Sequence, residues 1–314
     1  MTRSQPGAAF AQLVCAVVLF GASWPVTKTA FAHGADPAWF ALGRAALSGF
    51  GGAVALAVLG RLRVPGRADL PALFVLGLCQ LAGFFALSHA GLSLVPAGRT
   101  GVLANATPVW VVPLSLLLLR EPIPPRRWVA AGSGVLGVVV LAGPWAIDWA
   151  APGALAGHAL LLGAALSWAL AMVAVRRWPP RLPMLELLPW GFALACAALL
   201  PLAWAHAPGR WDGVAVGALV LIGLVVGPFG TWCVLQATVS LPAVVTSVGF
   251  LGTPVLGLVF SALWLGEAVT PDLLAGAALI LGGAVVGAWP GRAGAGGPGR
   301  GPGWARGRLR GLGR

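Results

Sequence analysis

Apolar residues in this chain gather into ten long runs that are separated by short polar connections. Each run has about 20 residues, the length that an α-helix needs to cross the ~30 Å hydrocarbon core of a bilayer. The runs are too long and unbroken for barrel strands, and an open sheet cannot face lipid. The pattern predicts an all-α integral membrane protein with ten transmembrane helices, over residues 9–31, 38–60, 70–90, 95–119, 128–147, 154–175, 184–206, 213–237, 242–265 and 271–289.

The composition of the chain supports this class. Of its 314 residues, 59% are apolar and 9% are charged, whereas about a quarter of an ordinary soluble domain is charged. A soluble fold needs more polar surface, and a disordered chain is less hydrophobic. Both classes are excluded for the chain as a whole. Only residues 290–314, which are rich in Gly, Pro and Arg, are predicted to form a basic disordered tail.

The basic residues lie mostly on one side of the predicted bundle. Arginines cluster in three alternate connections and in the tail, and together with Arg3 they make up 16 of the 20 basic residues. Because basic loops stay in the cytoplasm, we expect residues 1–8 and the tail to be cytoplasmic and the protein to lie in the inner membrane. The net charge of +12 thus reports orientation, and no nucleic-acid partner is expected. The arginines of the connections are Arg61, Arg63, Arg67, Arg120, Arg126, Arg127, Arg176, Arg177 and Arg181.

The chain contains an internal repeat at an offset of 146 residues. Residues 95–126 and 241–272 align without a gap, and 12 of the 32 pairs are identical, where composition alone gives roughly one match in ten. Span n then corresponds to span n+5, and because five is odd the second copy is inserted upside down. We therefore expect two inverted five-helix repeats, over residues 9–147 and 154–289. Such repeats are typical of secondary transporters, which bind substrate near the midplane; duplication for stability alone is the alternative.

These features resemble the EamA-type transporters of the drug/metabolite transporter superfamily. The resemblance rests on the repeat and on a Thr-Pro pair that is followed, after twelve further residues, by Glu in spans four and nine. It also rests on F-G-A-S-W-P-V-T-K at residues 20–28, on the spacing from Pro37 to Arg44 and on G-A-A-L-I-L-G-G at residues 276–283. It implies transport of an amino acid, metabolite, nucleoside or drug. It also implies a pocket with fewer hydrogen-bonding groups than is usual, since Phe20 and Phe84-Phe85 replace the Trp and Tyr of such families.

Three cations break the positive-inside pattern, and all lie in the first repeat. Lys28 is near the outer end of the first span, Arg44 lies about two turns into the second, and Arg99 opens the fourth. An ionisable group within a span is a functional hypothesis by default. Lys28 and Arg44 are therefore predicted to line a site for a carboxylate or phosphate, and Arg99 to serve gating or coupling. Alternatively, these side chains reach the outer headgroups or bind helix-end carbonyls, which we favour for Arg99.

Uncharged side chains within the spans complete the predicted substrate site. A Thr-Pro pair leaves a carbonyl without its helical partner, because proline has no N–H, so Pro108 and Pro254 predict helix breaks that expose backbone to a solute. Kinking for packing is the alternative. The predicted substrate contacts, besides Lys28 and Arg44, are Trp24, Phe84, Asn105, Thr107, Thr246 and Thr253.

Glu121 and Glu267 occupy equivalent positions in the two repeats and therefore opposite faces of the membrane. Each ends a span, where its charge opposes the helix dipole. We assign both to gating or coupling, either as structural groups at the rim or, less favoured, as proton carriers.

The combined pattern predicts a secondary transporter that exports a small metabolite by alternating access. The metabolite is expected to be amino-acid-like or amphipathic and to bear a carboxylate. The sequence has no ATP-binding loop, dinucleotide fingerprint or spaced Cys/His ligand set, so neither a cofactor nor a metal is expected.

The expected partners are the solute and membrane lipids, and proton coupling and oligomeric state are left open. The rival classes are an intramembrane enzyme and a non-transporting scaffold. An enzyme would need acids or histidines that converge from facing spans, and the acids here lie almost all at span ends.

Overall fold

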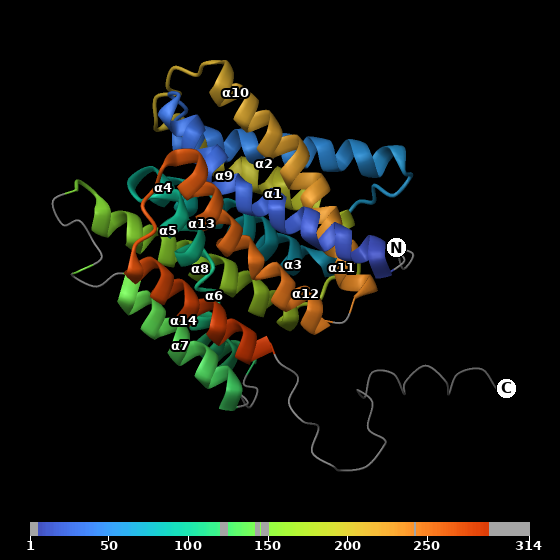
Figure 1. The fold of residues 1–314 in the computed structure, drawn as a ribbon. Coiled ribbons are helices and arrows are strands. Elements are labelled where there is room, and N and C mark those ends of the chain that lie inside the picture. Colours follow the sequence, from blue (N-terminus) through green and yellow to red (C-terminus); the bar gives the residue numbers. More distant parts are fainter. Residues whose placement is uncertain (1–5, 120–124, 142–144, 146–150, 242, 289–314) are drawn as a thin grey trace, which may run out of the picture.

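Helices account for nearly all of the chain in the computed structural model, which describes residues 6–119, 125–141, 145, 151–241 and 243–288 (Figure 1). Within this part of the chain, β-pairing is limited to one antiparallel bridge between Ala35 and Gly209. The all-α class is therefore confirmed. Seven helical segments are long and apolar enough to cross a membrane, namely Gly7–Ala32, Pro37–Val58, Arg67–Leu94, Ala97–Leu119, Ala154–Arg177, Met184–Trp204 and Gly213–Ser240.

Four of these seven segments are continuous helices and three are built from shorter pieces. The continuous ones are α1 (Pro6–Ala32), α2 (Pro37–Val58), α8 (Ala154–Arg177) and α9 (Met184–Trp204). The pieces are η1 (Arg67–Asp69), α3 (Leu70–Phe74), η2 (Val75–Gly83) and α4 (Phe84–Leu94), then α5 (Ala97–Ala104), α6 (Thr107–Leu114) and η3 (Ser115–Leu119), then α10 (Gly213–Val220), η4 (Leu221–Gly230) and α11 (Thr231–Ser240).

The three remaining predicted spans correspond to shorter helices. Residues 128–147 overlap α7 (Pro125–Leu141), which has 17 residues. Residues 242–265 are divided between α12 (Ala243–Phe250) and α13 (Gly252–Leu265), and residues 271–289 form α14 (Pro271–Ala288). The prediction of ten spans is therefore confirmed only in part, since helix length and apolarity alone support seven.

The interruptions of the helices lie just before the Thr-Pro pairs. α5 ends at Ala104 and α6 begins at Thr107, so Asn105 and Ala106 separate them. In the second half of the chain, Leu251 separates α12 from α13, whose first turn contains Thr253 and Pro254. Proline is well tolerated in the first turn of a helix, where its missing N–H needs no partner. The two prolines therefore start the second pieces of these segments.

Two of the long segments have a π-helical centre, η2 and η4, at which another helix approaches closely. A Cβ added at Gly223 in η4 would lie 2.5 Å from the Cβ of Leu47 in α2. A Cβ at Gly77 in η2 would lie 2.8 Å from Cδ2 of Leu194 in α9. Glycine thus lets α2 pack against η4 and α9 against η2, as small residues do between membrane helices.

The most extensive helix contacts join the first half of the chain to the second. α7 packs along α14 (Figure 1), α2 along α9, α1 along α13 and α4 along α8. Contacts recur between pairs of helices that the 146-residue offset relates: η2 and α4 pack on α8 as η4 and α11 pack on α1, and α6 packs on α8 as α13 packs on α1. The two halves of the chain therefore share one core.

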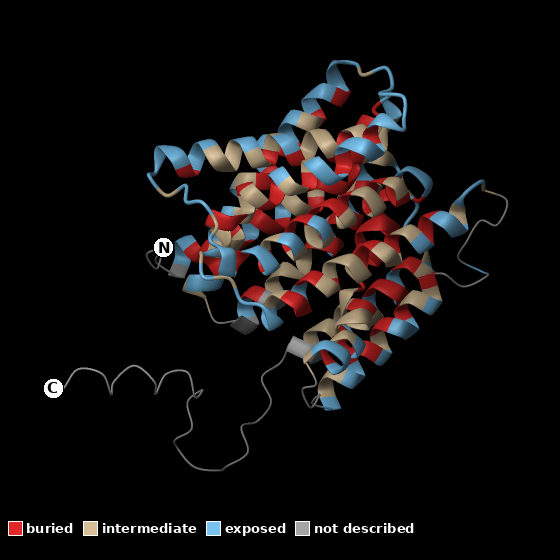
Figure 2. Cartoon of the chain, turned by 180° about the vertical axis from the view of Figure 1, so that it is seen from behind, coloured by how far each residue is buried: buried red, intermediate tan, exposed pale blue. Residues whose placement is uncertain are grey.

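Large apolar side chains cover much of the outer surface, while buried residues follow the centre of the bundle (Figure 2). Val58 is 81% exposed and Leu263 80% exposed, and Trp264 and Phe50 are also exposed. Apolar exposure on this scale is rare on soluble monomers and is expected of helices that face lipid.

Candidate functional site

Arg44 is a half-buried cation on α2 without a counter-charge in the described part of the chain. Its Cζ atom lies 4.4 Å from the centroid of the Phe85 ring, within the range of a cation–π interaction. Its Nε atom is buried and has no hydrogen-bond partner among the described residues. A cation in this setting is costly unless a group outside the protein's own side chains completes its hydrogen bonds.

His89 is the nearest polar neighbour of Arg44. It is 1% exposed on α4, and its Nε2 atom lies 3.5 Å from Nη1 of Arg44, at the limit of a hydrogen bond. Because a guanidinium can only donate, this contact requires Nε2 to accept and leaves the proton on Nδ1. The Nδ1 proton faces the carbonyl of Phe85, one turn earlier on α4, without the geometry of a full hydrogen bond.

Four aromatic rings beside Arg44 form what we call the aromatic site: Trp24, Phe84, Phe85 and Trp168. Phe84 lies 6.3 Å from Phe85, 4.9 Å from Trp168 and 6.5 Å from Trp24, measured between ring centroids. Trp24 comes from α1 and Trp168 from α8, so the rings of the two halves of the chain meet at Phe84. Edge-on and tilted contacts at these distances are favourable arrangements of aromatic rings.

Lys28 is engaged at the C-terminal end of α4. Its ammonium donates to the carbonyl oxygens of Leu92, Val95 and Ser93 at 2.6, 3.1 and 3.3 Å. These carbonyls lack helical partners, and a lysine there also complements the helix dipole. All three donors of Lys28 are used in this way, whereas Arg44 keeps a free donor.

Arg99 and Glu267 tie the N-terminal end of α5 to the second half of the chain. Arg99 donates to the carbonyl of Leu141 at 2.9 Å and forms a 2.9 Å ion pair with Asp272. Glu267 accepts hydrogen bonds from the backbone N–H groups of Ala97 and Gly98 at 2.6 and 2.8 Å. Its carboxylate therefore satisfies the orphan donors of α5. Glu121 lies outside the described residues.

The remaining predicted contacts lie near the helix interruptions. Asn105 donates to the carbonyl of Gly101 at 2.7 Å and so ends α5. Thr107 is half-buried at the start of α6, and Thr246 and Thr253 are buried, at 6% and 5% exposure. The Oγ1 atom of Thr253 has no partner among the described residues.

Of the residues singled out from the sequence, the structure brings Trp24 and Phe84 together and links them to Arg44 through Phe85. His89 was missed, because a lone histidine in an apolar run reads as a core residue. Its spacing of four from Phe85, which places both on one helix face, was the available signal. The described residues contain no cluster of three His, Cys, Asp or Glu that could hold a metal.

Comparison with known proteins identifies relatives over nearly the whole chain. The model of the EamA-like transporter family matches residues 7–143 and 155–288. A solved crystal structure is similar with a TM-score of 0.62 and 25% identity, covering 91% of this chain and 98% of that one.

Several curated proteins are also similar. The probable terminal-alkyne amino-acid exporter of Streptantibioticus cattleyicolor is 28% identical over 87% of this chain and 91% of its own length. The uncharacterized transporter YvbV of Bacillus subtilis is 28% identical over 84% and 86%. The aromatic amino acid exporter YddG of Ancylobacter novellus is 32% identical over 51% and 56%.

Proposed function

The chain belongs to the EamA-like transporter family, and we propose that it exports a small amino acid with an apolar or aromatic side chain. The family and its relatives are transporters and exporters, not enzymes, as the resemblance in the sequence implied. The chain is thus a multi-pass membrane transporter. The observation that carries the substrate proposal is the pairing of Arg44 with the aromatic site.

Arg44 and the aromatic site complement the two ends of such a substrate. The guanidinium has a buried Nε donor without a partner and no paired carboxylate in the described chain, so a substrate carboxylate would complete it with charge-assisted hydrogen bonds. The ring of Phe85 lies against the guanidinium. The ring of Phe84 lies beside that of Phe85 and contacts the rings of Trp24 and Trp168. An apolar side chain attached to that carboxylate would lie among these rings. Two relatives are named as amino-acid exporters, one of them for aromatic amino acids.

We propose ten spans in two inverted repeats that rock around this site, with both termini in the cytoplasm of the inner membrane. The two ranges matched by the family, 7–143 and 155–288, support two repeats of nearly equal length. So do the equivalent contacts of α8 with η2 and α4 and of α1 with η4 and α11. Inverted halves of this kind give inward-open and outward-open arrangements by exchanging conformations.

Arg99 and Glu267 are proposed as parts of the outer gate. Their ion pair and backbone hydrogen bonds join α5 to α14 and to the end of α13, across the two halves. Opening this end of the bundle would have to separate these partners. Lys28, which fastens α1 to α4, would keep those two helices moving together.

We further propose that export follows the substrate gradient without proton coupling. Each carboxylate in the described part of the chain is engaged by backbone N–H groups or by a cation, so none is a vacant proton carrier. They are Asp36, Asp69, Asp212, Asp272, Glu186 and Glu267.

Counterflow in proteoliposomes tests this function. Vesicles loaded with unlabelled phenylalanine are expected to accumulate external labelled phenylalanine, with or without a protonophore, and protein-free vesicles are not. The absence of counterflow for any amino acid would refute the substrate class. Counterflow that the protonophore abolishes would refute gradient-driven export.

A further inference from the structure

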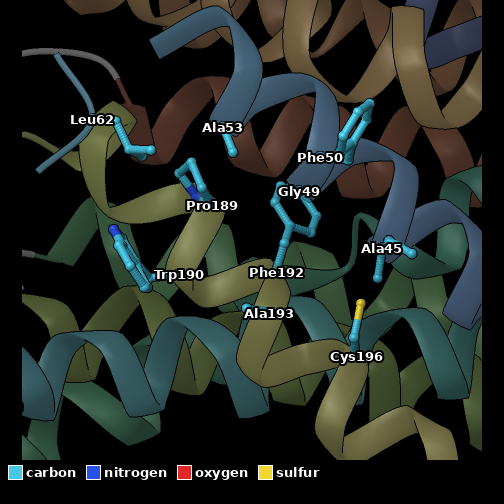
Figure 3. A pocket seen from close by; sticks show the side chains of 11 residues that line it. Ala45, Gly49, Phe50, Ala53, Leu62, Pro189, Trp190, Phe192, Ala193 and Cys196 are labelled. Atoms are coloured by element: carbon cyan, nitrogen blue, oxygen red, sulfur yellow. The ribbon is translucent and has the colours of Figure 1, made fainter. Parts of the chain in front are cut away.

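A groove of about 300 Å³ runs along the outer side of the contact between α2 and α9. Small residues, among them Ala45, Gly49 and Ala193, line it together with the rings of Phe50 and Phe192 (Figure 3). Every side chain that lines it is apolar except the indole N–H of Trp190 and the thiol of Cys196. Arg44 and the rings of the aromatic site are not among its lining residues, although the ring of Phe192, which lines it, lies 6.4 Å from that of Phe85.

The groove is elongated along the two helices. Leu62 and Trp190 lie at one end, and Ala45 and Cys196 lie toward the other (Figure 3). From Trp190 to Cys196 along α9, and from Ala53 to Ala45 along α2, the helices rise about 9 to 12 Å. This length is roughly two thirds of the thickness of one leaflet of the ~30 Å hydrocarbon core. The groove therefore follows the path of one acyl chain from the membrane surface toward the midplane.

The surface end of the groove carries excess positive charge. Trp190 donates from Nε1 to the carbonyl of Arg63 at 2.8 Å, which places Arg63 directly at this end. Arg61 takes up the buried carboxylate of Glu186 at 2.7 Å, and Arg63 reaches the same carboxylate only at 3.8 Å. The Arg63 side chain is 68% exposed. The single carboxylate of Glu186 thus faces two guanidinium groups. The guanidinium of Arg63, which is the more distant, can still bind an anion.

We propose that this groove is a binding site for an anionic phospholipid, with one acyl chain between α2 and α9 and the phosphate at Arg63. Apolar walls suit a hydrocarbon chain, and basic pockets between membrane helices suit anionic headgroups. An indole at the boundary between these two parts is the usual place of tryptophan at a membrane surface. The site is independent of the transport function proposed above.

Other occupants fit the groove less well. An amino acid would have to bury its ammonium and carboxylate against walls without a charged side chain. A second copy of the chain would fill the apolar part, but it would bring another Arg63 toward the first across a twofold interface. Charge complementarity therefore favours the lipid.

Native mass spectrometry of the detergent-purified full chain tests the site. Phosphatidylglycerol and phosphatidylcholine with identical acyl chains are added in turn, and the fraction of protein with one bound lipid is measured. The native chain is expected to bind phosphatidylglycerol more tightly. Arg63→Gln should weaken phosphatidylglycerol binding about fivefold and leave phosphatidylcholine unchanged. Arg177→Gln, an exposed arginine of α8 that does not line the groove, is the matched control and should change neither.

A second variant separates the groove from the headgroup contact. Ala193→Trp fills the groove from an exposed position, so it should fold and should weaken the binding of both lipids. Ala278→Trp, on the exposed face of α14, is its control. The proposal is overturned if Ala193→Trp retains native lipid binding, if the native chain binds both lipids equally, or if Ala193→Trp instead dissociates a dimer present in the native protein.

Discussion

The guanidinium of Arg44 lies over the ring of Phe85, with Cζ 4.4 Å from the ring centroid. This contact joins the charged and the aromatic parts of the candidate site, because the ring of Phe85 lies next to that of Phe84, which contacts both Trp24 and Trp168. The four aromatic residues come from three helices, α1, α4 and α8. A movement of one half of the chain against the other would therefore change the shape of this site, as alternating access requires.

Phe84→Ala is expected to weaken selection for aromatic substrates. The ring of Phe84 is the one that contacts both tryptophans, so its removal should raise KM for phenylalanine about tenfold and KM for alanine much less. Counterflow with both amino acids measures this. Phe74→Ala, which removes an exposed ring of α3, is the control. An equal loss for both amino acids would indicate a packing role and contradict a role in specificity.

Glu267→Gln is expected to loosen the outer end of the bundle. The carboxylate accepts from Ala97 and Gly98, and an amide oxygen can replace only one of its two oxygens. By analogy with lost helix caps, the variant should lose about 1 kcal/mol of stability. A fall of a few degrees in Tm, together with an altered counterflow rate, is the expected result. Native Tm and native counterflow together would argue against the proposed gate.

Asp212, in the connection before α10, is expected to make a pH-dependent contribution to the stability of the fold. Backbone hydrogen bonds, first from Ala215, and the imidazole of His33 at 2.6 Å lower the pKa of this carboxyl. Because the pKa is lower in the folded protein, the ionised carboxylate stabilises the fold at every pH above the ordinary pKa of about 3.9. This contribution is lost as the pH falls through the pKa of the folded protein.

Asp212→Asn isolates that contribution, because asparagine keeps the helix cap and loses the charge. The variant should have a lower Tm than the native chain at pH 7, and the difference should shrink below about pH 4. Tm measured from pH 3 to pH 8 checks this. A difference that does not depend on pH would mean that the charge contributes nothing.

The helical class and most helix positions could be predicted from the sequence, because long apolar runs have few structural solutions in a membrane. The run 9–31 became α1 (Pro6–Ala32) and the run 184–206 became α9 (Met184–Trp204). Irregular turns within the helices could not be predicted in the same way. The π-helical centres η2 and η4 lie against α9 and α2, and no local sequence pattern predicts a contact between such distant segments.

The site was predictable residue by residue but not as an arrangement. Lys28 and Arg44 are alike in the sequence, since each is a cation in the outer part of a span. The structure distinguishes them by their partners: Lys28 lies against three carbonyls at the end of α4, and Arg44 lies against His89 and Phe85. Which helix faces which cation depends on packing across the bundle, and a single sequence does not specify it.

Arg44 is proposed to bind the carboxylate of an amino acid, and counterflow of phenylalanine compared with phenylethylamine, which lacks the carboxylate, is the decisive measurement of this role. Charge-assisted hydrogen bonds contribute about 1.5–3 kcal/mol, so the native protein should prefer phenylalanine by about 10- to 150-fold. Arg44→Gln should lower phenylalanine counterflow by a similar factor and abolish the preference, while Arg44→Lys should recover part of it. An Arg44→Gln variant that transports phenylalanine with the native preference would show that Arg44 does not bind the carboxylate.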